Sequence, residues 1–256
     1  MKKITSRFWL ATAAALLTGV TSAPWARSAD STVLRVGVSA NSPPMIFKQG
    51  DKIVGVEADL AEALGRELGR KITFVEEKWE NIIDALNEDR IDIIMSNMSI
   101  TPARRYRVAF TTSYLKVGQM ALSRSAEKYN YLLNLADQTK RGIGVKPGTT
   151  ADFLVGQEFP RVKKKYYKSG DAAAEALMKS KIDLFVSDAP IIWYLASMYE
   201  TKGLGVMPLV LSQEELGWGV KRSDTQLLSS ANAFLQKAQA SGDLNRILGT
   251  WMPGFR

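Results

Sequence analysis

Residues 85–97 read ALNEDRIDIIMSN and residues 176–188 read ALMKSKIDLFVSD, so the chain carries the same pattern twice. Each copy reads as the end of a helix, a basic turn and a short unbroken apolar run, which predicts a strand buried on both faces. A polar pair follows each run, and ligands of open parallel sheets bind beyond the carboxyl ends of the strands. Unless the match arose by chance, it predicts two similar sheets whose polar pairs face each other across one cleft.

Strand and helix patterns alternate around both copies. Residues 33–38 and 72–75 have strand character, and residues 57–68 form an amphipathic helix pattern that ends at Gly69. The second unit opens with a strand pattern at residues 142–145. The other predicted elements are helices at residues 80–86, 150–156 and 169–177 and a weak strand at residues 166–167. This alternation predicts a mostly parallel sheet in each unit, with helices on both faces.

Two extended segments connect the units. Residues 114–123 and residues 216–220 read as strands that cross from one unit to the other. An amphipathic helix over residues 225–247 would pack back on the first unit, which makes that unit discontinuous. The predicted organisation is a first lobe at residues 30–115 and 222–256 and a second lobe at residues 116–221.

Residues 1–29 read as a signal peptide. Basic residues precede an apolar run at residues 8–20, which is too short to span a membrane, and small residues follow. We place the cleavage point between residues 22 and 29, and the lack of cysteine excludes a lipid-anchored cysteine. No later stretch reaches the roughly 18 apolar residues of a membrane span. The mature chain is therefore expected to be a soluble, exported protein.

The composition restricts the chemistry that is open to this chain. It contains neither histidine nor cysteine, which excludes Ser-His-Asp and Cys-His catalysis as well as the usual zinc sites. Binding is therefore favoured over catalysis, and neither a metal nor a cofactor is expected. Half of the formal charge of +8 lies in the predicted signal peptide. We interpret the basic run at residues 161–168 as a solvated strand edge and expect no nucleic-acid partner.

A helix start after the first repeat predicts an anion site. Thr101 suits the N-cap and Pro102 the first helical position, but Arg104 and Arg105 then lie where the helix dipole favours acids. A bound carboxylate held by Arg104, with backbone amides near Ser99, would resolve the conflict. The alternative is a surface salt bridge between Arg104 and an acidic neighbour.

The second unit offers a similar helix start and a carboxylate. A turn at Gly148, followed by Thr149 and Thr150, places backbone amides and a hydroxyl at a helix start, although such turns are common without a ligand. Asp188 suits a ligand ammonium group and also the cap of the next helix, and the two roles are compatible. Trp79, at the end of a predicted strand, is either a wall of the ligand site or part of the core.

Two pairs of adjacent glutamates resemble catalytic carboxylate pairs. They are Glu76-Glu77 and Glu214-Glu215. Adjacent residues of a strand point to opposite faces, so we assign both pairs to the surface.

A series of motifs spans the mature chain. It comprises LRVGV at residues 34–38, PP at 43–44, GVEADLA at 55–61, ID at 91–92, SITPAR at 99–104, GTT at 148–150, and Asp188. In this order, the motifs resemble the bacterial family 3 extracellular solute-binding proteins, the polar amino-acid receptors of ABC importers. The resemblance implies an α/β fold of the type II periplasmic-binding-protein class. In that fold two lobes, each a mostly parallel sheet flanked by helices, are joined by a two-strand hinge and close on the ligand.

The resemblance also implies roles for individual residues. Arg104 resembles the arginine that holds the α-carboxylate of the ligand, with Ser99 and Thr150 as supporting donors. Asp188 resembles the acid that receives the α-ammonium group. Trp79 resembles the apolar or aromatic wall beside the ligand side chain.

Three further positions, Asn97, Thr149 and Ser39, complete the predicted pocket, and Ser42 bears on its specificity. Asn97 matches a position whose backbone carbonyl contacts the ligand ammonium group, and Thr149 belongs to the turn at residues 148–150. Ser39 lies where receptors for basic amino acids resemble one another in having an acid, and Ser42 lies where an aromatic residue commonly stacks on the ligand. Because both serines are small and uncharged, the resemblance favours a neutral or polar amino acid over a basic one.

The expected function is that of a periplasmic receptor rather than an enzyme. As a monomer, it would capture an L-α-amino acid between its lobes and deliver it to the membrane permease of an ABC importer. The alternative is a periplasmic cyclohexadienyl or arogenate dehydratase on the same scaffold, which would need a general acid in the cleft. A sensor domain would require a membrane segment or a further domain after Trp251.

Overall fold

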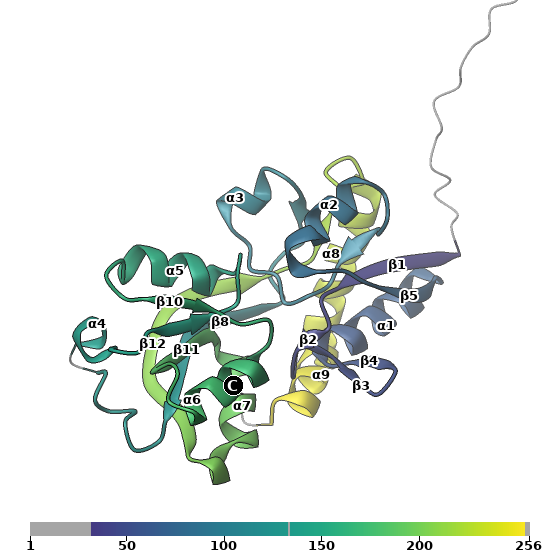
Figure 1. The fold of residues 1–256 in the computed structure, drawn as a ribbon. Coiled ribbons are helices and arrows are strands. Elements are labelled where there is room, and N and C mark those ends of the chain that lie inside the picture. The colour runs from purple at the N-terminus through teal and green to yellow at the C-terminus, as the bar shows by residue number, and fades with distance from the viewer. Residues whose placement is uncertain (1–31, 133, 254–256) are drawn as a thin grey trace, which may run out of the picture. The chain divides into compact units, whose positions relative to one another are not determined.

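The first sheet of the computed structural model, which describes residues 32–132 and 134–253, is built from distant parts of the chain (Figure 1). The predicted signal peptide lies outside the described residues. In spatial order the strands are β5 (Lys71–Glu76), β1 (Val33–Val38), β6 (Ile93–Ile94), β13 (Gly219–Val220) and β7 (Ala109–Phe110). β1 is parallel to β5 and β6, whereas β13 is antiparallel to β6 and β7. The sheet is therefore mixed, because β13 enters it from the returning crossing.

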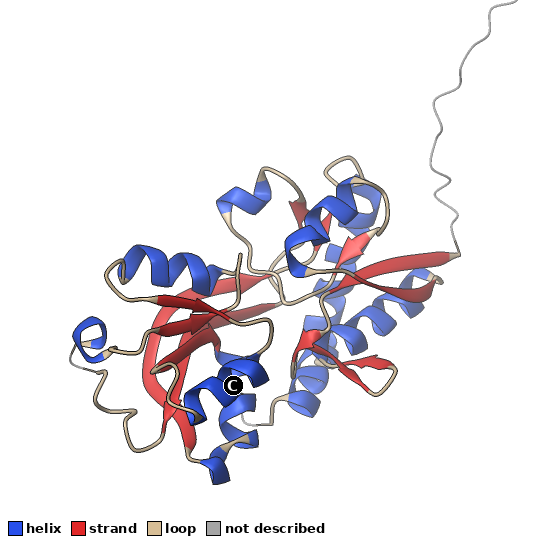
Figure 2. Cartoon of the chain, viewed as in Figure 1, coloured by secondary structure: helices blue, strands red, loops and turns tan. Residues whose placement is uncertain are grey.

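Helices cover this sheet on two sides, and a small three-stranded sheet lies beside it (Figure 2). The helices are α1 (Val56–Leu68), η1 (Trp79–Asn81), α2 (Ile82–Asn87), α3 (Pro102–Arg105), α8 (Thr225–Ser241) and α9 (Asp243–Trp251), and the small sheet contains β2 (Asn41–Ser42), β3 (Ile46–Gln49) and β4 (Lys52–Val54). Gly69 caps α1 in the left-handed conformation (φ 63°), as predicted. The prediction of one helix over residues 225–247 is wrong, because the chain turns at Gly242 (φ 81°) and α8 and α9 are separate.

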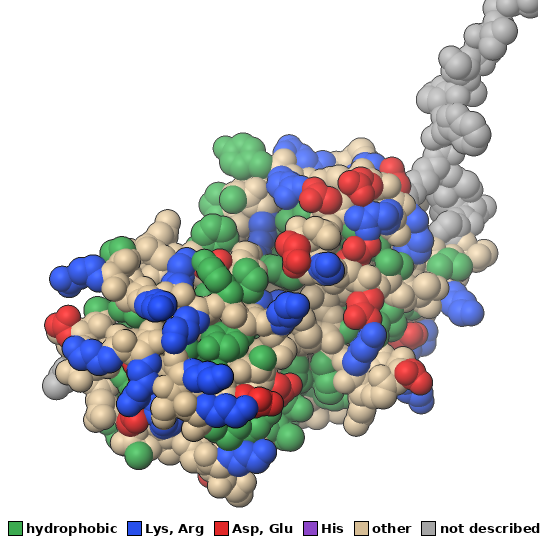
Figure 3. Space-filling view, viewed as in Figure 1, with side chains coloured by type: hydrophobic (Ala, Val, Ile, Leu, Met, Phe, Trp, Pro, Cys, Tyr) green, Lys and Arg blue, Asp and Glu red, His purple; other side chains and the backbone are tan. Residues whose placement is uncertain are grey.

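The second sheet repeats the parallel part of the first. In spatial order its strands are β10 (Lys164–Tyr166), β9 (Ile143–Val145), β11 (Leu184–Asp188), β8 (Leu115–Arg124) and β12 (Leu204–Leu216). β9 is parallel to β10 and β11, and β8 is antiparallel to β11 and β12. Its helices are α4 (Leu135–Gln138), α5 (Thr150–Glu158), α6 (Gly170–Met178), α7 (Ala189–Met198) and η2 (Glu200–Lys202). β10 is an edge strand, so the basic run lies on a sheet edge as predicted, and Figure 3 shows lysine and arginine side chains gathered on this lobe.

The two copies of the repeat fold alike. Alternate residues of β6 enter separate apolar cores on the two faces of the first sheet, and those of β11 do the same in the second. Asp92 accepts hydrogen bonds from the backbone N (2.9 Å) and the Nη2 (2.7 Å) of Arg35. At the equivalent position Asp183 accepts from the backbone N (2.5 Å) and the Nη1 (2.7 Å) of Arg141. In each lobe the repeat therefore joins its sheet through a buried aspartate.

The two crossings between the lobes lie side by side. β8 and β12 pair in antiparallel fashion, with Leu115 opposite Leu216. Just outside this ladder, the backbone N of Thr111 donates to the O of Trp218 (3.0 Å). β13 belongs to the first sheet although it falls in the range predicted for the second lobe, and the lobe boundaries otherwise stay a prediction. Among the described residues, no helix is long and apolar enough to span a membrane.

Candidate functional site

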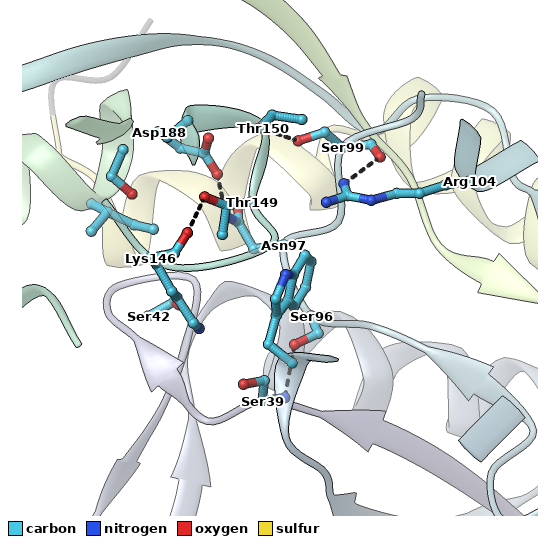
Figure 4. A pocket seen from close by; sticks show the side chains of 14 residues that line it. Ser39, Ser42, Ser96, Asn97, Ser99, Arg104, Lys146, Thr149, Thr150 and Asp188 are labelled. Carbon is cyan, nitrogen blue, oxygen red and sulfur yellow. Dashed lines mark hydrogen bonds between the residues drawn. The ribbon is translucent and has the colours of Figure 1, made fainter. Parts of the chain in front are cut away.

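One cavity brings together all eight residues of the predicted site (Figure 4). They are Ser39, Trp79, Asn97, Ser99, Arg104, Thr149, Thr150 and Asp188. The other lining residues are Ser42, Ser96, Lys146, Ala151, Ser187 and Ile191. The cavity therefore lies between residues of both lobes, at the exits of the repeat strands. Contact of these side chains with a ligand stays a prediction.

The polar ends of the two repeats meet directly. Asn97 follows β6 in the left-handed conformation (φ 53°), and its Nδ2 donates a hydrogen bond to the Oδ2 of Asp188 at the end of β11. The Oδ1 of Asn97 is buried and has no hydrogen-bond partner in the described part of the chain. The amide oxygen thus remains able to accept a hydrogen bond from a ligand.

Asp188 is held by amide donors and does not cap its helix. It occupies the N-cap position of α7, but its side chain makes no capping hydrogen bond, so the predicted capping role is wrong. Its carboxylate accepts hydrogen bonds from Asn97 and from the Nε2 of Gln119. Burial, together with the nearby Glu214 carboxylate, raises the pKa of Asp188 to about 6. A positive ligand group would relieve this penalty.

Arg104 reaches the cavity from α3. Thr101 is the N-cap, as predicted, and its hydroxyl accepts from the backbone N of Arg104 (3.2 Å). The guanidinium group donates to the O of Ser99 (2.8 Å) and the O of Gly148 (3.4 Å), and burial lowers its pKa. Within residues 32–132 and 134–253 Arg104 forms no salt bridge, so the surface salt-bridge alternative is wrong.

The two threonines at the start of α5 have different partners. The hydroxyl of Thr149 caps α5 and donates to the O of Lys146 (2.7 Å). The hydroxyl of Thr150 donates to the Oε2 of Glu214 (2.8 Å) and lies 3.4 Å from the Oγ of Ser99 in the other lobe. Thr150 and Ser99 therefore form a second polar contact between the lobes.

Glu214 lies inside the site region, so its assignment to the surface is wrong. The alternation argument is correct for the pair, because Glu215 points outward while Glu214 turns inward and accepts from Gln119 (3.1 Å) as well as Thr150. Gln119 was also missed, although its polar side chain on a buried strand was a usable signal. Glu214 does not line the cavity. Among the fourteen lining residues, Asp188 is the only carboxylate.

Lys146 is a second cation in the cavity that the sequence reading missed. It follows β9 directly, so the strand-exit rule that located Asn97 and Asp188 also applied to it. Its Nζ donates to the Oδ1 of Asn41 (2.5 Å) in the first lobe. Burial lowers the pKa of Lys146 to about 8.

Trp79 lies between the two cations. The Cζ of Arg104 and the Nζ of Lys146 are 5.1 Å and 5.6 Å from its ring centroid, distances typical of cation–π contacts. The indole Nε1 donates to the O of Gly148 (3.1 Å) in the second lobe. The ring also packs partly against the core around α2, so Trp79 serves both as a wall of the cavity and as a packing residue.

Ser39 lines the first-lobe side of the cavity. It is buried, and its backbone N donates to the Oγ of Ser96 (2.8 Å). Ser42 lines the cavity as well. The two positions that the resemblance linked to ligand class therefore do lie at the site and carry no charge.

Two α/β lobes around a polar cavity, with an arginine in one lobe and an aspartate in the other, define a two-lobe binding protein. The family model of the bacterial extracellular solute-binding proteins, family 3, matches residues 34–254, and the chain belongs to this family. It is 29% identical to the ABC transporter arginine-binding protein 1 of Escherichia coli (strain K12) over 228 residues, which cover 86% of this chain and 90% of that protein.

Solved structures of ancestral proteins share the fold. One, an ancestral arginine-binding protein bound to glutamine, has a TM-score of 0.79 and 28% identity, and the match covers 86% of this chain and 98% of that chain. Another, the ancestral amino acid-binding protein AncCDT-1, a precursor of cyclohexadienyl dehydratase, has a TM-score of 0.77 and 29% identity, with 86% and 95% covered. The chain thus has the type II periplasmic-binding-protein fold.

Proposed function

We propose that this protein is a periplasmic receptor that binds an L-α-amino acid between its lobes and delivers it to an ABC importer. One observation carries the proposal: Arg104 and Asp188 line the same cavity from opposite lobes, and neither forms a salt bridge in the described chain. Buried charges are costly without a partner. The carboxylate and ammonium groups of a free amino acid would supply one partner for each.

The ligand side chain is proposed to be neutral or polar. Once Asp188 binds the ammonium group, no carboxylate remains among the described cavity residues to pair with a second cation. Lys146 and Arg104 would repel a basic side chain, and Ser39 and Ser42 offer only hydroxyl groups. Structures of an ancestral arginine-binding protein are known with glutamine and with arginine, so a neutral ligand is compatible with this fold.

Binding would act through lobe closure. Asn97, Trp79 and Asn41 of the first lobe already contact the second lobe through hydrogen bonds. A ligand held by Arg104 and Asp188 together interacts fully only with the closed form, so it shifts the population toward closure. We propose that the permease recognises this closed monomer.

The catalytic alternative has little support in the cavity. A dehydratase needs a general acid beside its substrate. Among the described lining residues Asp188 is the only carboxylic acid, and Lys146, the other candidate, already donates to Asn41. If Asp188 binds an ammonium group, it stays ionised and has no proton to donate. Family membership and the binding-protein relatives agree with a receptor.

A thermal-unfolding screen of the mature, ligand-stripped protein tests the proposal. Each L-amino acid, prephenate and arogenate would be added separately. A ligand at a thousand times its Kd adds about 4 kcal/mol, which raises Tm by roughly 8–16 °C for a chain of this size. We expect such a shift with one or a few neutral or polar amino acids. A shift with prephenate or arogenate alone, and product formation from it, would instead establish the enzyme.

Replacing Lys146 with glutamine should relax the exclusion of basic ligands. The Lys146→Gln variant removes a cation from the cavity wall, so we expect its affinity for L-arginine to rise about tenfold relative to its affinity for the preferred amino acid. Isothermal titration calorimetry measures both constants. Lys163→Gln, an exposed site of the second lobe, is the control. An unchanged preference would remove Lys146 from the specificity argument.

A further inference from the structure

A carboxylate buried in the first lobe joins three separate segments of the chain. Glu57, in the first turn of α1, is 0% exposed. Its Oε1 accepts hydrogen bonds from the backbone N of Asn97 (2.8 Å) and the hydroxyl of Tyr114 (2.7 Å). Its Oε2 accepts from the indole Nε1 of Trp218 (2.9 Å). Glu57 does not line the ligand cavity, so no role assigned above accounts for it.

The three partners belong to the segments that take part in closure: the loop at the cavity and the two crossings between the lobes. Asn97 belongs to the loop that donates to Asp188 across the cavity. Tyr114 immediately precedes β8, in the first crossing, and Trp218 lies between β12 and β13, in the returning crossing. The rings of Tyr114 and Trp218 also pack together, with centroids 5.8 Å apart. One side chain therefore connects the binding loop to both crossings.

The geometry favours an acceptor without a hydrogen of its own. The N–H groups of Asn97 and Trp218 can only donate, whereas the hydroxyl of Tyr114 can donate or accept. An ionised carboxylate accepts from all three. A glutamine or a protonated glutamate places a hydrogen among these donors, so at least one of the contacts weakens or reverses.

We propose that Glu57 is a positioning residue for ligand binding. It connects the loop at Asn97 to both crossings, so that the lobes close in one relative orientation. The proposal rests on the amino-acid receptor function, because closure around a ligand is its consequence. It extends that function to a residue without ligand contact. It also makes affinity depend on the ionisation of a single buried group.

That group changes its ionisation near neutral pH. Burial raises the pKa of Glu57 to about 7, against the opposing effect of its three donors. Among those donors only Tyr114 is titratable, and burial and the Glu57 charge hold its pKa well above the ordinary value. Asp188 is the other carboxylate that acts on Tyr114. The three-way hydrogen bonding is therefore complete above neutral pH and weakened below it.

The test compares Kd values of wild type, Glu57→Gln and Asp92→Asn for the amino acid found by thermal screening. Asp92 is a buried carboxylate of the same lobe, away from the cavity, and its replacement should leave affinity unchanged. At about pH 8.5, Glu57→Gln should bind at least about tenfold more weakly than wild type. At about pH 5.5 the ratio should shrink to within about threefold, because wild-type Glu57 is then protonated.

This ratio separates positioning from a merely structural role. Titration of Asp188 acts on wild type and variant alike, so it cancels. A ratio near one at the higher pH, or a large ratio that is equal at both pH values, would overturn the proposal.

A second measurement needs neither ligand nor the Glu57 variant. In ligand-free wild type, the ¹H–¹⁵N resonance of the Trp218 indole should titrate near neutral pH, because its N–H donates to Glu57. Tyr114→Phe removes a donor to the carboxylate and should move this midpoint to higher pH. An indole resonance that stays constant from about pH 5 to pH 9 contradicts the proposal. If the wild type binds no amino acid, the proposed receptor function is wrong. The indole titration still tests whether Glu57 changes its ionisation beside Trp218.

Discussion

Arg104→Ala should abolish amino-acid binding, with a loss of affinity of about 100-fold or more. A guanidinium group binds a carboxylate through two charge-assisted hydrogen bonds, each of about 1.5–3 kcal/mol. The side chain is already held in place by the O of Ser99 and by the face of Trp79, so its orientation is not paid for at binding. No other described cation of the cavity lies on α3, and Lys146 is engaged with Asn41.

Two further variants make the Arg104 experiment specific. Arg104→Lys keeps the charge but loses the planar fork, so it should retain part of the affinity. Arg105→Ala removes the exposed neighbouring arginine of α3 and should bind like wild type. Isothermal titration calorimetry provides the constants, and circular dichroism checks the fold. If Arg104→Ala binds within about tenfold of wild type, the carboxylate lies elsewhere.

Local patterns predicted the elements that position the site. The repeat located both strand exits, and the signals at Thr101 and Gly69 located helix ends, because caps depend on residues within one turn. The break between α8 and α9 was missed because apolar residues continue at helical spacing on both sides of Gly242. The glycine itself was the available signal for that break.

Long-range polar contacts escaped the sequence reading. Glu57 forms hydrogen bonds with residues 40, 57 and 161 positions away in the sequence. No local pattern predicts contacts of this kind. Strand alternation showed that Glu214 and Glu215 point to opposite faces. It did not show which face the crossing strand β12 presents to the site. That choice depends on how β12 pairs with β8, which places Glu214 opposite Val117.

Asp188→Asn should weaken binding by more than about 100-fold at neutral pH. The ammonium group of the ligand would lose its carboxylate, and removal of one partner from a buried charge pair costs about 3–5 kcal/mol. Asparagine is nearly isosteric with aspartate. Its amide N–H group would, however, face Asn97 and Gln119, which both donate to Asp188 in the wild type. Glu215→Gln, on the outward face of β12, is the matched control. Wild-type affinity in Asp188→Asn would exclude Asp188 as the ammonium site.

The pH dependence of Asp188 has opposite signs for binding and for stability. Its pKa of about 6 in the folded, ligand-free protein exceeds the ordinary 3.8. As pH falls, Asp188 is therefore protonated at a higher pH in the folded state than in the unfolded state. Asp188 should therefore contribute a rise in the stability of the ligand-free protein as pH falls from about 6 to about 4, of at most about 3 kcal/mol. The ammonium group needs the ionised form, so affinity should fall up to tenfold per pH unit over the same range.

Urea unfolding and calorimetry across this pH range measure the two effects. Asp188→Asn should remove the part of each effect that comes from Asp188. Because burial also raises the pKa of Glu57, to about 7, the rise in stability that comes from Glu57 is retained in that variant, and the difference between wild type and variant measures Asp188. The opposite signs are decisive, because general acid unfolding would lower stability and affinity together. A contrary result would be a fall in the stability of the ligand-free wild type between about pH 6 and pH 4 that is as steep as the fall in affinity. That result would show that Asp188 is not the buried carboxylate that binds the ligand ammonium group.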